Sequence, residues 1–265
     1  MPLKKSFLAT GITVYLFYAG LALAAGSVQE ELNAVVLSIK EEGLAVYYED
    51  VPKPSWPTAL FQAADPSEAA ALTNYLKLFK EEMKKYPPSF IPRTGLKGVV
   101  FVKKLFYKEI PAEGFYDYRQ NLIFLDFLRS HGFPIAQRHN IHHELFHVID
   151  YFANKKPSAW NDPAWSNFND PDFHYGKQKF PPQSKMEMSF FDPTYPGFMS
   201  AYAMTAVGED KAETFACFMM PSQIRILNRW IKTDAILRKK VEFIKDFIGG
   251  FCPEMNEEFW KKLAK

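Results

Sequence analysis

The stretch that decides the fold is residues 141–150, with the sequence IHHELFHVID. It contains His143, Glu144 and His147 in the pattern H-E-x-x-H. Residues four positions apart lie one above the other on the same face of an α-helix, so both histidines present their imidazoles from one rigid element. The residues around them are mostly apolar, as in a buried helix. The pattern therefore predicts a helix over residues 135–154 with two histidines on one face.

This spacing also predicts a metal site. Zinc binds neutral imidazole nitrogen at about 2.0–2.1 Å, and a catalytic zinc has three protein ligands and one open position. We therefore predict that His143 and His147 bind one Zn²⁺ ion. Glu144 is rotated away from the ligand pair, where its carboxylate can act as general base on a water whose pKa zinc lowers to about 7. Because three fixed residues match by chance in roughly 1% of such chains, the motif alone is a hypothesis.

A third protein ligand is expected from a later helix. One metallopeptidase pattern places Gly and His after the second histidine, but those positions hold Asp150 and Ala153 here. Glu209 and Glu213 lie four apart on a predicted helix, so one of them can bind the metal while the other orients a ligand histidine. Asp150, one helical turn after His147, is a further candidate for orienting a ligand. The alternative interpretation of the two glutamates is the solvated start of a helix.

The remaining histidines and the cysteines are weaker candidates for a role in the site. His142 faces elsewhere on its helix and is expected at the surface or next to the ligands, and His174 lies alone in a predicted loop. Either of them could close the site as a fourth ligand. Cys217 and Cys252 are the only cysteines. Two are too few for a disulfide framework, so they form one bridge or remain buried thiols.

Composition predicts a folded domain and excludes a nucleic-acid-binding protein. The 265 residues include 25 Phe, 13 Tyr and 5 Trp, which supply ample material for a packed core. The formal net charge is only +2. Because the chain has no long basic run, it lacks the clustered positive charge that nucleic acids require.

The first 25 residues have the pattern of a secretory signal peptide. Lys4 and Lys5 precede an uncharged, mostly apolar stretch, near the end of which Ala22 and Ala24 fit the small-x-small pattern before a cleavage site. The alternative is an uncleaved anchor, because the stretch is just long enough to span a bilayer. We expect cleavage, with export to the periplasm or the extracellular space. Without residues 1–25 the chain has 30 basic and 30 acidic residues, so no stable membrane association is expected after cleavage.

Residues 26–265 are predicted to form a single α+β domain. Helices are expected from Ser27, which can cap the first of them, over 66–86, and from about 206 onward. Short β-rich runs at 99–102 and 121–126 predict a small sheet that is antiparallel in part. Residues 155–200, rich in Pro and aromatic residues, are expected to form one long loop. The domain then has three parts: N-terminal helices (26–95), a catalytic core (96–220) and C-terminal helices (221–265).

The sequence resembles the gluzincin zinc metallopeptidases, and within them the family of the anthrax lethal factor catalytic domain. The resemblance covers residues 141–220 and rests on three features. The first is H-E-x-x-H followed by x-x-D at 143–150, and the second is the run EDKAETFA at 209–216. The third is a Tyr-Ala step that begins at Tyr202, seven residues before Glu209.

This resemblance implies a zincin-like metallopeptidase fold, mostly helical, with a small mixed sheet and the long loop described above. It also implies Glu209 as the third zinc ligand and Glu213 as a residue that contacts and orients a ligand without binding the ion itself. Tyr202 would donate a hydrogen bond to the oxyanion that develops during peptide hydrolysis, an interaction that is often the largest catalytic term.

The function predicted is that of a secreted zinc endopeptidase that hydrolyses peptide or protein substrates. An extended substrate would add as a strand beside an edge strand within residues 115–126. One alternative is a catalytically inactive secreted binding or scaffold protein on the same fold, with structural zinc or none. Another is a membrane-anchored regulator that retains residues 1–25.

Overall fold

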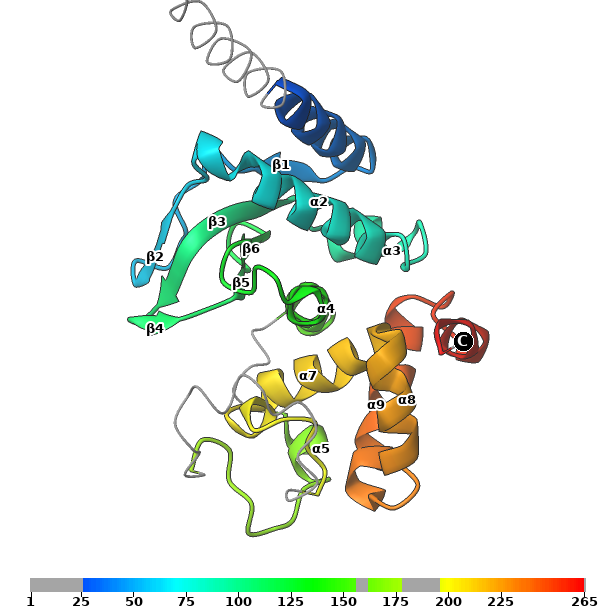
Figure 1. Ribbon diagram of the computed structural model, residues 1–265. Helices are drawn as coiled ribbons and strands as arrows, with labels where there is room; N and C mark the ends of the chain where they lie inside the picture. Colours follow the sequence, from blue (N-terminus) through cyan, green and yellow to red (C-terminus); the bar gives the residue numbers. More distant parts are fainter. Residues whose placement is uncertain (1–25, 156–161, 178–195, 265) are drawn as a thin grey trace, which may run out of the picture.

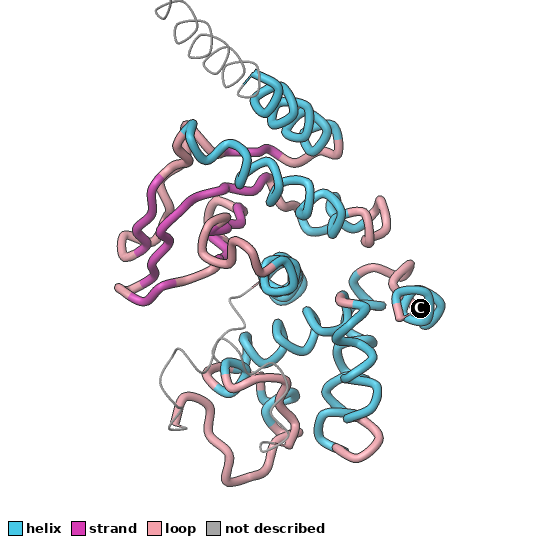
Figure 2. Tube along the Cα trace, in the orientation of Figure 1, coloured by secondary structure: helices cyan, strands magenta, loops and turns pink. Residues whose placement is uncertain are grey.

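A computed structural model describes residues 26–155, 162–177 and 196–264 of the chain (Figure 1). The protein is α+β, as predicted, with a small mixed sheet and many helices (Figure 2). The predicted signal peptide and parts of the predicted long loop, 156–161 and 178–195, lie outside the described residues. Among the described helices, none combines the length and the apolar character that a bilayer crossing needs.

The sheet is mixed. Four strands lie in the order β1, β3, β6, β5, where β3 pairs in parallel with β1 and β6, and β5 pairs antiparallel with β6. Two further strands, β2 and β4, pair antiparallel with the far end of β3. Their bounds are β1 Ala45–Tyr47, β2 Ala59–Gln62, β3 Gly98–Tyr107, β4 Ile110–Pro111, β5 Gly114–Asp117 and β6 Leu122–Asp126. The edge strand predicted within 115–126 is a hairpin of two strands, of which β5 is the edge.

Strand β3 is buried on both faces, which explains its continuous apolar sequence. Val99 and Phe101 point into the main hydrophobic core, while Val100 and Val102 belong to a second cluster on the opposite face. All four are fully buried. Helices cover the main-core face of the sheet, and the helix with the H-E-x-x-H motif is one of those that pack against the sheet.

The N-terminal helices agree with the sequence except at the first cap. The first described helix occupies residues 26–41, so Ser27 already lies within it and does not cap it. The second predicted helix is a 3₁₀ turn, Pro66–Glu68, followed by α2, Ala69–Met83. The turn begins with a capping box in which Asp65 and Glu68 bond each other's backbone N–H groups.

Helix α4, Pro134–Asn154, carries the H-E-x-x-H motif and lies in the middle of the molecule (Figure 1). The sheet and α2 lie on one side of it, and α7, Val207–Met219, lies on the other. The remaining helices are α3 Phe90–Thr94, α5 Pro163–Ser166, α8 Pro221–Trp230, α9 Ala235–Phe251 and α10 Glu257–Leu263. Cys217 of α7 and Cys252 after α9 are buried free thiols, so the bridged alternative is wrong.

The described part of the segment between α4 and α7 is anchored to α7. It contains the short helix α5, where the sequence predicted only loop. The fully buried Trp165 donates a hydrogen bond of 2.8 Å to Asp210 of α7, and Tyr175 donates one of 2.6 Å to the same oxygen. Lys240 of α9 forms a buried ion pair of 2.7 Å with that oxygen. These contacts hold the first turn of α7, which carries Glu209, in place.

Candidate metal centre

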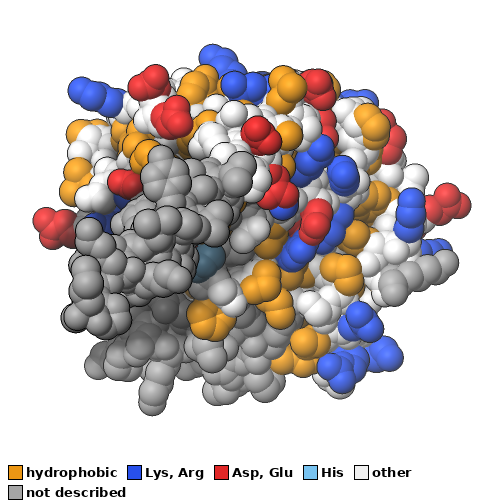
Figure 3. Space-filling view, turned by 45° about the horizontal axis from the view of Figure 1, so that its top comes forward, with side chains coloured by type: hydrophobic (Ala, Val, Ile, Leu, Met, Phe, Trp, Pro, Cys, Tyr) orange, Lys and Arg blue, Asp and Glu red, His pale blue; other side chains and the backbone are white. Residues whose placement is uncertain are grey.

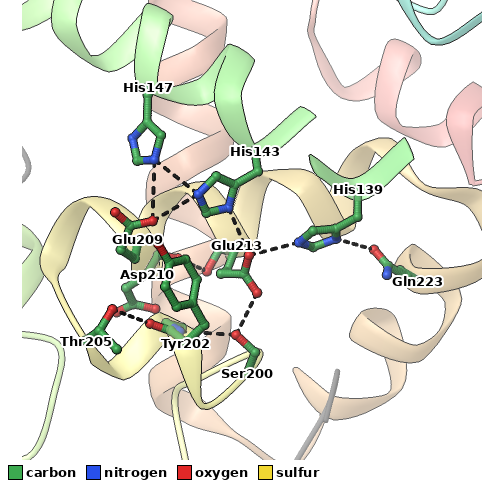
Figure 4. Close-up of polar contacts among 12 residues, drawn as sticks. His139, His143, His147, Ser200, Tyr202, Thr205, Glu209, Asp210, Glu213 and Gln223 are labelled. Atoms are coloured by element: carbon green, nitrogen blue, oxygen red, sulfur yellow. Dashed lines mark hydrogen bonds and ion pairs between the residues drawn. The ribbon is translucent and has the colours of Figure 1, made fainter. Parts of the chain in front are cut away.

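Three side chains from α4 and α7 converge where these helices pack against each other (Figure 4). His143 Nε2 lies 3.1 Å from His147 Nε2 and 2.9 Å from Glu209 Oε2. His147 Nε2 lies 3.5 Å from the same glutamate oxygen. The two histidines reach one point because they are one helical turn apart, as predicted. Glu209 joins them from the first turn of α7.

The triangle of donor atoms has the size that a tetrahedral zinc ion needs. Two ligands bound at 2.0–2.1 Å to a tetrahedral ion lie about 3.3–3.4 Å apart. The three edges here are 2.9, 3.1 and 3.5 Å. Two imidazole nitrogens and one carboxylate oxygen are also a ligand set found in catalytic zinc sites. The residues present therefore fit a zinc ion.

Glu213 contacts the other nitrogen of His143. Its Oε1 lies 2.9 Å from His143 Nδ1, and its Oε2 accepts a hydrogen bond of 2.6 Å from Ser200. The carboxylate of Glu213 can accept a hydrogen bond from Nδ1 only when the imidazole carries its proton there. The lone pair of neutral His143 is then on Nε2. That lone pair faces His147 and Glu209, as metal binding requires.

Electrostatics concentrate negative charge at this point. Burial lowers the pKa of His143, but hydrogen bonds to Glu209 and Glu213 outweigh it and raise that pKa well above its usual value. Burial likewise lowers the pKa of His147, but the charge of Glu209 outweighs it, so this pKa is also raised. The pKa of Glu209 is lowered, because His147 and His143 outweigh its burial. The cluster therefore attracts positive charge, whether as protons or as a metal ion.

Glu144 lies on the neighbouring face of α4, next to strand β5. It is only 4% exposed, and its Oε2 has no hydrogen-bond partner among the described residues. Burial raises the pKa of its carboxyl group, although the nearby His147 and His143 oppose the shift. A buried polar atom without a partner is costly, so within the described part of the chain this oxygen has room for a further hydrogen-bond partner. A carboxylate with raised pKa is suited to moving a proton.

The close approach of β5 to Glu144 depends on a glycine. A Cβ atom at Gly114 would lie 2.9 Å from both Cγ and Oε1 of Glu144 and 3.0 Å from the side-chain amide of Asn140. Such contacts are too short for any other residue without movement of the glutamate. Gly114 therefore lets the edge strand pass directly beside the carboxylate.

Tyr202 lies beside His143, one of the two candidate ligand histidines, as Figure 4 shows. It begins the 3₁₀ turn Tyr202–Met204, and its ring centroid is 5.8 Å from that of His143. The residue is 45% exposed at the surface. Burial of its hydroxyl group and the negative charge of Glu209 raise its pKa well above the usual value. It therefore stays protonated near neutral pH and can donate a hydrogen bond.

Asp150, predicted to orient a ligand, and His174, weighed as an alternative ligand, both lie outside the cluster. Asp150 is buried, accepts a hydrogen bond of 2.8 Å from Asn154 and lies 3.5 Å from Lys211 of α7. In the part of the chain that the structure describes, no hydrogen bond joins it to His147. His174 is exposed and is not in either metal-capable group of described residues.

The expectation that His142 lies at the surface or next to the ligands is wrong. It is fully buried, with its Nε2 2.6 Å from Glu82 of α2 and its Nδ1 2.7 Å from the hydroxyl of Tyr86. It faces α2 because neighbouring helix positions are rotated by about 100°. It is therefore not a fourth ligand.

Three residues near the site were missed by sequence reasoning: His139, Ser200 and Gly114. A signal existed for His139, because His139, His143 and His147 repeat every four residues along one stripe of α4. Nothing in the sequence identifies Ser200 or Gly114, since their importance arises from contacts between segments distant in the chain.

The centre is open to solvent on one side. The side chains of His147 and Glu209 are each 20% exposed, whereas that of His143 is 7% exposed. Figure 3 shows one face of the molecule, on which hydrophobic side chains lie between charged ones. A small molecule or an extended chain can therefore approach the cluster.

Comparison with known proteins shows a shared fold. No protein-family model matches the chain, and no curated protein matches it by sequence. It is similar to a crystal structure of a protein from Bacteroides caccae that is described as a candidate zinc-binding metallo-peptidase. The TM-score is 0.52 at 14% sequence identity, over 90% of this chain and 91% of that chain. The fold is therefore of a kind seen in a candidate metallopeptidase, and the narrower resemblance to the lethal factor family stays a prediction.

Proposed function

We propose that this chain is a zinc-dependent metallopeptidase in which His143, His147 and Glu209 hold the ion. The observation that carries the proposal is the convergence of two Nε2 atoms and one carboxylate oxygen within 2.9–3.5 Å. The buried, unpartnered carboxylate oxygen of Glu144 on the adjacent helix face supports it. The similarity of the fold to a candidate zinc-binding metallo-peptidase agrees with it.

Each residue of the cluster has one task in this proposal. Zinc, when bound, supplies positive charge that polarises a peptide carbonyl and makes water more acidic. Glu144 accepts a proton from the attacking water and returns it to the amine that leaves when the C–N bond breaks. Tyr202 donates a hydrogen bond to the carbonyl oxygen as it becomes negative. Glu213 keeps the Nε2 lone pair of His143 directed at the ion.

The substrate in this proposal is an extended peptide or protein segment that lies beside β5. Strand β5 is an edge strand of the described sheet and pairs with β6. Gly114 brings it directly beside Glu144. An extended chain that adds to a sheet edge is held by main-chain hydrogen bonds, which places one peptide bond near the base.

The wider assignment belongs to the same proposal. The protein acts after export to the periplasm or the extracellular space, with residues 1–25 removed. Residues 26–265 form one zincin-like domain related to the lethal factor catalytic domain. The basis is the sequence of the first 25 residues and the three motif features between 141 and 220.

The test is Glu144→Gln in the full chain, assayed on a mixed peptide library with zinc content measured in parallel. We expect zinc to be retained and kcat to fall by about 10²–10⁴-fold, the usual contribution of a general base. Glu81→Gln is the control, because Glu81 is an exposed glutamate of α2 that pairs with Arg138. Near wild-type turnover in Glu144→Gln contradicts the proposal. A zinc-free wild type without activity favours the binding or scaffold protein instead.

A further inference from the structure

Glu213 is the point where several hydrogen bonds behind the candidate ligands meet. Its Oε1 lies 2.9 Å from His143 Nδ1 and 2.9 Å from His139 Nε2, and its Oε2 accepts from Ser200 at 2.6 Å. We propose that His139 is a positioning residue of the metal centre, which fixes the carboxylate of Glu213 and through it the ring of His143. This inference rests on the proposed function, because it assumes that His143 is a metal ligand.

The geometry connects three helices through one imidazole. His139 lies one turn before His143 on α4 and is 4% exposed. Its Nδ1 lies 3.0 Å from the side-chain amide of Gln223 in α8, while its Nε2 faces Glu213 of α7 (Figure 4). Both ring nitrogens are therefore engaged, so the ring cannot rotate without the loss of a contact. A ring held in this way gives Glu213 a donor in a constant position.

The carboxylate of Glu213 depends on such a hydrogen-bond donor because no cationic side chain among the described residues pairs with it. It is 5% exposed, and among the described residues no Lys or Arg contacts it. With His139 and Ser200 in place, one oxygen is shared by two imidazoles and the other is held by a hydroxyl. Without His139 the carboxylate keeps only its contacts with His143 and Ser200, so the orientation of His143 becomes less defined. Outer partners of metal ligands typically change metal affinity by 10–100-fold.

A second metal ion is the competing interpretation of the same residues. Atoms of His139, His143 and Glu213 lie within 4.8 Å of one another, so they could also surround a cation. That arrangement requires His143 to bind one ion through each nitrogen and to lose its Nδ1 proton. A neutral imidazole that donates from Nδ1 and coordinates through Nε2 needs no such loss, so the hydrogen-bonded arrangement is favoured.

The experiment measures zinc affinity by chelator competition for the wild type, His139→Leu, His139→Gln and His142→Gln, all as full chains. We expect His139→Leu to raise the zinc dissociation constant by about 10–100-fold. His139→Gln restores a donor near the position of Nε2, so this variant should lose less zinc affinity than His139→Leu. His142→Gln is the matched control, a neighbouring buried histidine whose carboxylate partner, Glu82, belongs to α2. Its zinc affinity should equal that of the wild type.

Further readouts separate a positioning role from a structural one. The thermal midpoint of each metal-free variant is measured, together with the visible absorption spectrum of its Co²⁺-substituted form. We expect His139→Leu to alter the cobalt spectrum, which reports ligand geometry, whereas His142→Gln lowers the thermal midpoint and leaves the spectrum unchanged.

Three outcomes overturn the inference, and they differ from a failure of the proposed function. Unchanged affinity in His139→Leu removes the positioning role. Equal losses in His139→Leu and His142→Gln point to general destabilisation. Two zinc ions in the wild type and one in His139→Leu assign His139 to a second metal site. If the wild type itself binds no zinc, the proposed function fails first.

Discussion

Helix α4 carries a histidine–carboxylate cluster on each of two faces. The metal-centre cluster, which faces α7, consists of His143, Glu144, His147, Glu209 and Glu213. The Glu82 cluster, which faces α2, consists of Glu82, Lys85, Tyr86, Arg138 and His142. In both clusters an imidazole nitrogen lies within 2.9 Å of a buried glutamate oxygen, that of Glu82 or that of Glu213. The consecutive residues His142 and His143 thus lie in two chemically similar environments on different faces of one helix.

The two clusters differ in charge balance. Glu82 forms ion pairs with Lys85 and Arg138, in addition to its hydrogen bond with His142. Among the described residues, no Lys or Arg pairs with Glu144, Glu209 or Glu213 in the metal-centre cluster. Buried charges are normally paired, so among the described residues the Glu82 cluster is balanced by its own cations, whereas the metal-centre cluster is not. The difference favours a structural role for the Glu82 cluster and agrees with the cation site that we propose in the metal-centre cluster.

The largest effect should come from breaking the Glu82 cluster. We expect Glu82→Ala to lower the free energy of unfolding by about 3–5 kcal/mol, because removal of one partner leaves buried groups uncompensated. Denaturant unfolding of the metal-free protein measures this loss. Zinc binding to the fraction that remains folded should keep its affinity. A large fall in affinity without a loss of stability would reverse the roles assigned to the two clusters.

In the metal-centre cluster, Tyr202→Phe should affect catalysis rather than stability. We expect kcat to fall by about 10²–10³-fold, equivalent to roughly 3–4 kcal/mol, as for loss of one donor to an oxyanion. Because the residue is 45% exposed, the midpoint of thermal unfolding should hardly change. Steady-state kinetics on a peptide that the wild type cleaves give the answer. A variant with wild-type kcat excludes Tyr202 from the oxyanion site.

Acid should weaken the Glu82 cluster through His142. Burial outweighs the hydrogen bond with Glu82 and lowers the pKa of His142 from 6.5 to about 4. The unfolded chain therefore takes up this proton first as pH falls below 6.5, and the folded state loses about 3 kcal/mol by pH 4. We expect His142→Gln to remove this dependence in the metal-free protein. The difference between the stability curves of the two proteins reports on His142 and its partner Glu82, and parallel curves would contradict the assignment.

The smallest effect is expected at Gly114. Its replacement by alanine places a Cβ atom 2.9 Å from Glu144, so the carboxylate must shift by a few tenths of an ångström. We expect Gly114→Ala to lower kcat by about tenfold, because small misplacements of a catalytic group reduce rates strongly. Zinc content should not change. Gly26→Ala, at a position with open space, is the matched control, and equal kcat values in both variants would show that the contact is unimportant.

The sequence predicted what depends on local periodicity. The helical spacing of His143 and His147 and the apolar run in β3 each follow from neighbours in the chain, and the structure has both elements. The convergence of Glu209 with the histidines was suggested by resemblance, and its geometry fits. What sequence reasoning missed depends on contacts between distant segments. The burial of His142 against α2 and the approach of Gly114 to Glu144 have no signature in local sequence.

The central claim is that the metal-centre cluster holds zinc through His143, His147 and Glu209. The most direct test is metal content by mass spectrometry of the purified full chain, with the wild type and Glu209→Ala measured side by side. We predict about one zinc ion per wild-type chain, in keeping with a three-ligand catalytic site, and little or none in the variant. Zinc that stays undiminished in Glu209→Ala, or that is missing from the wild type, would contradict the account.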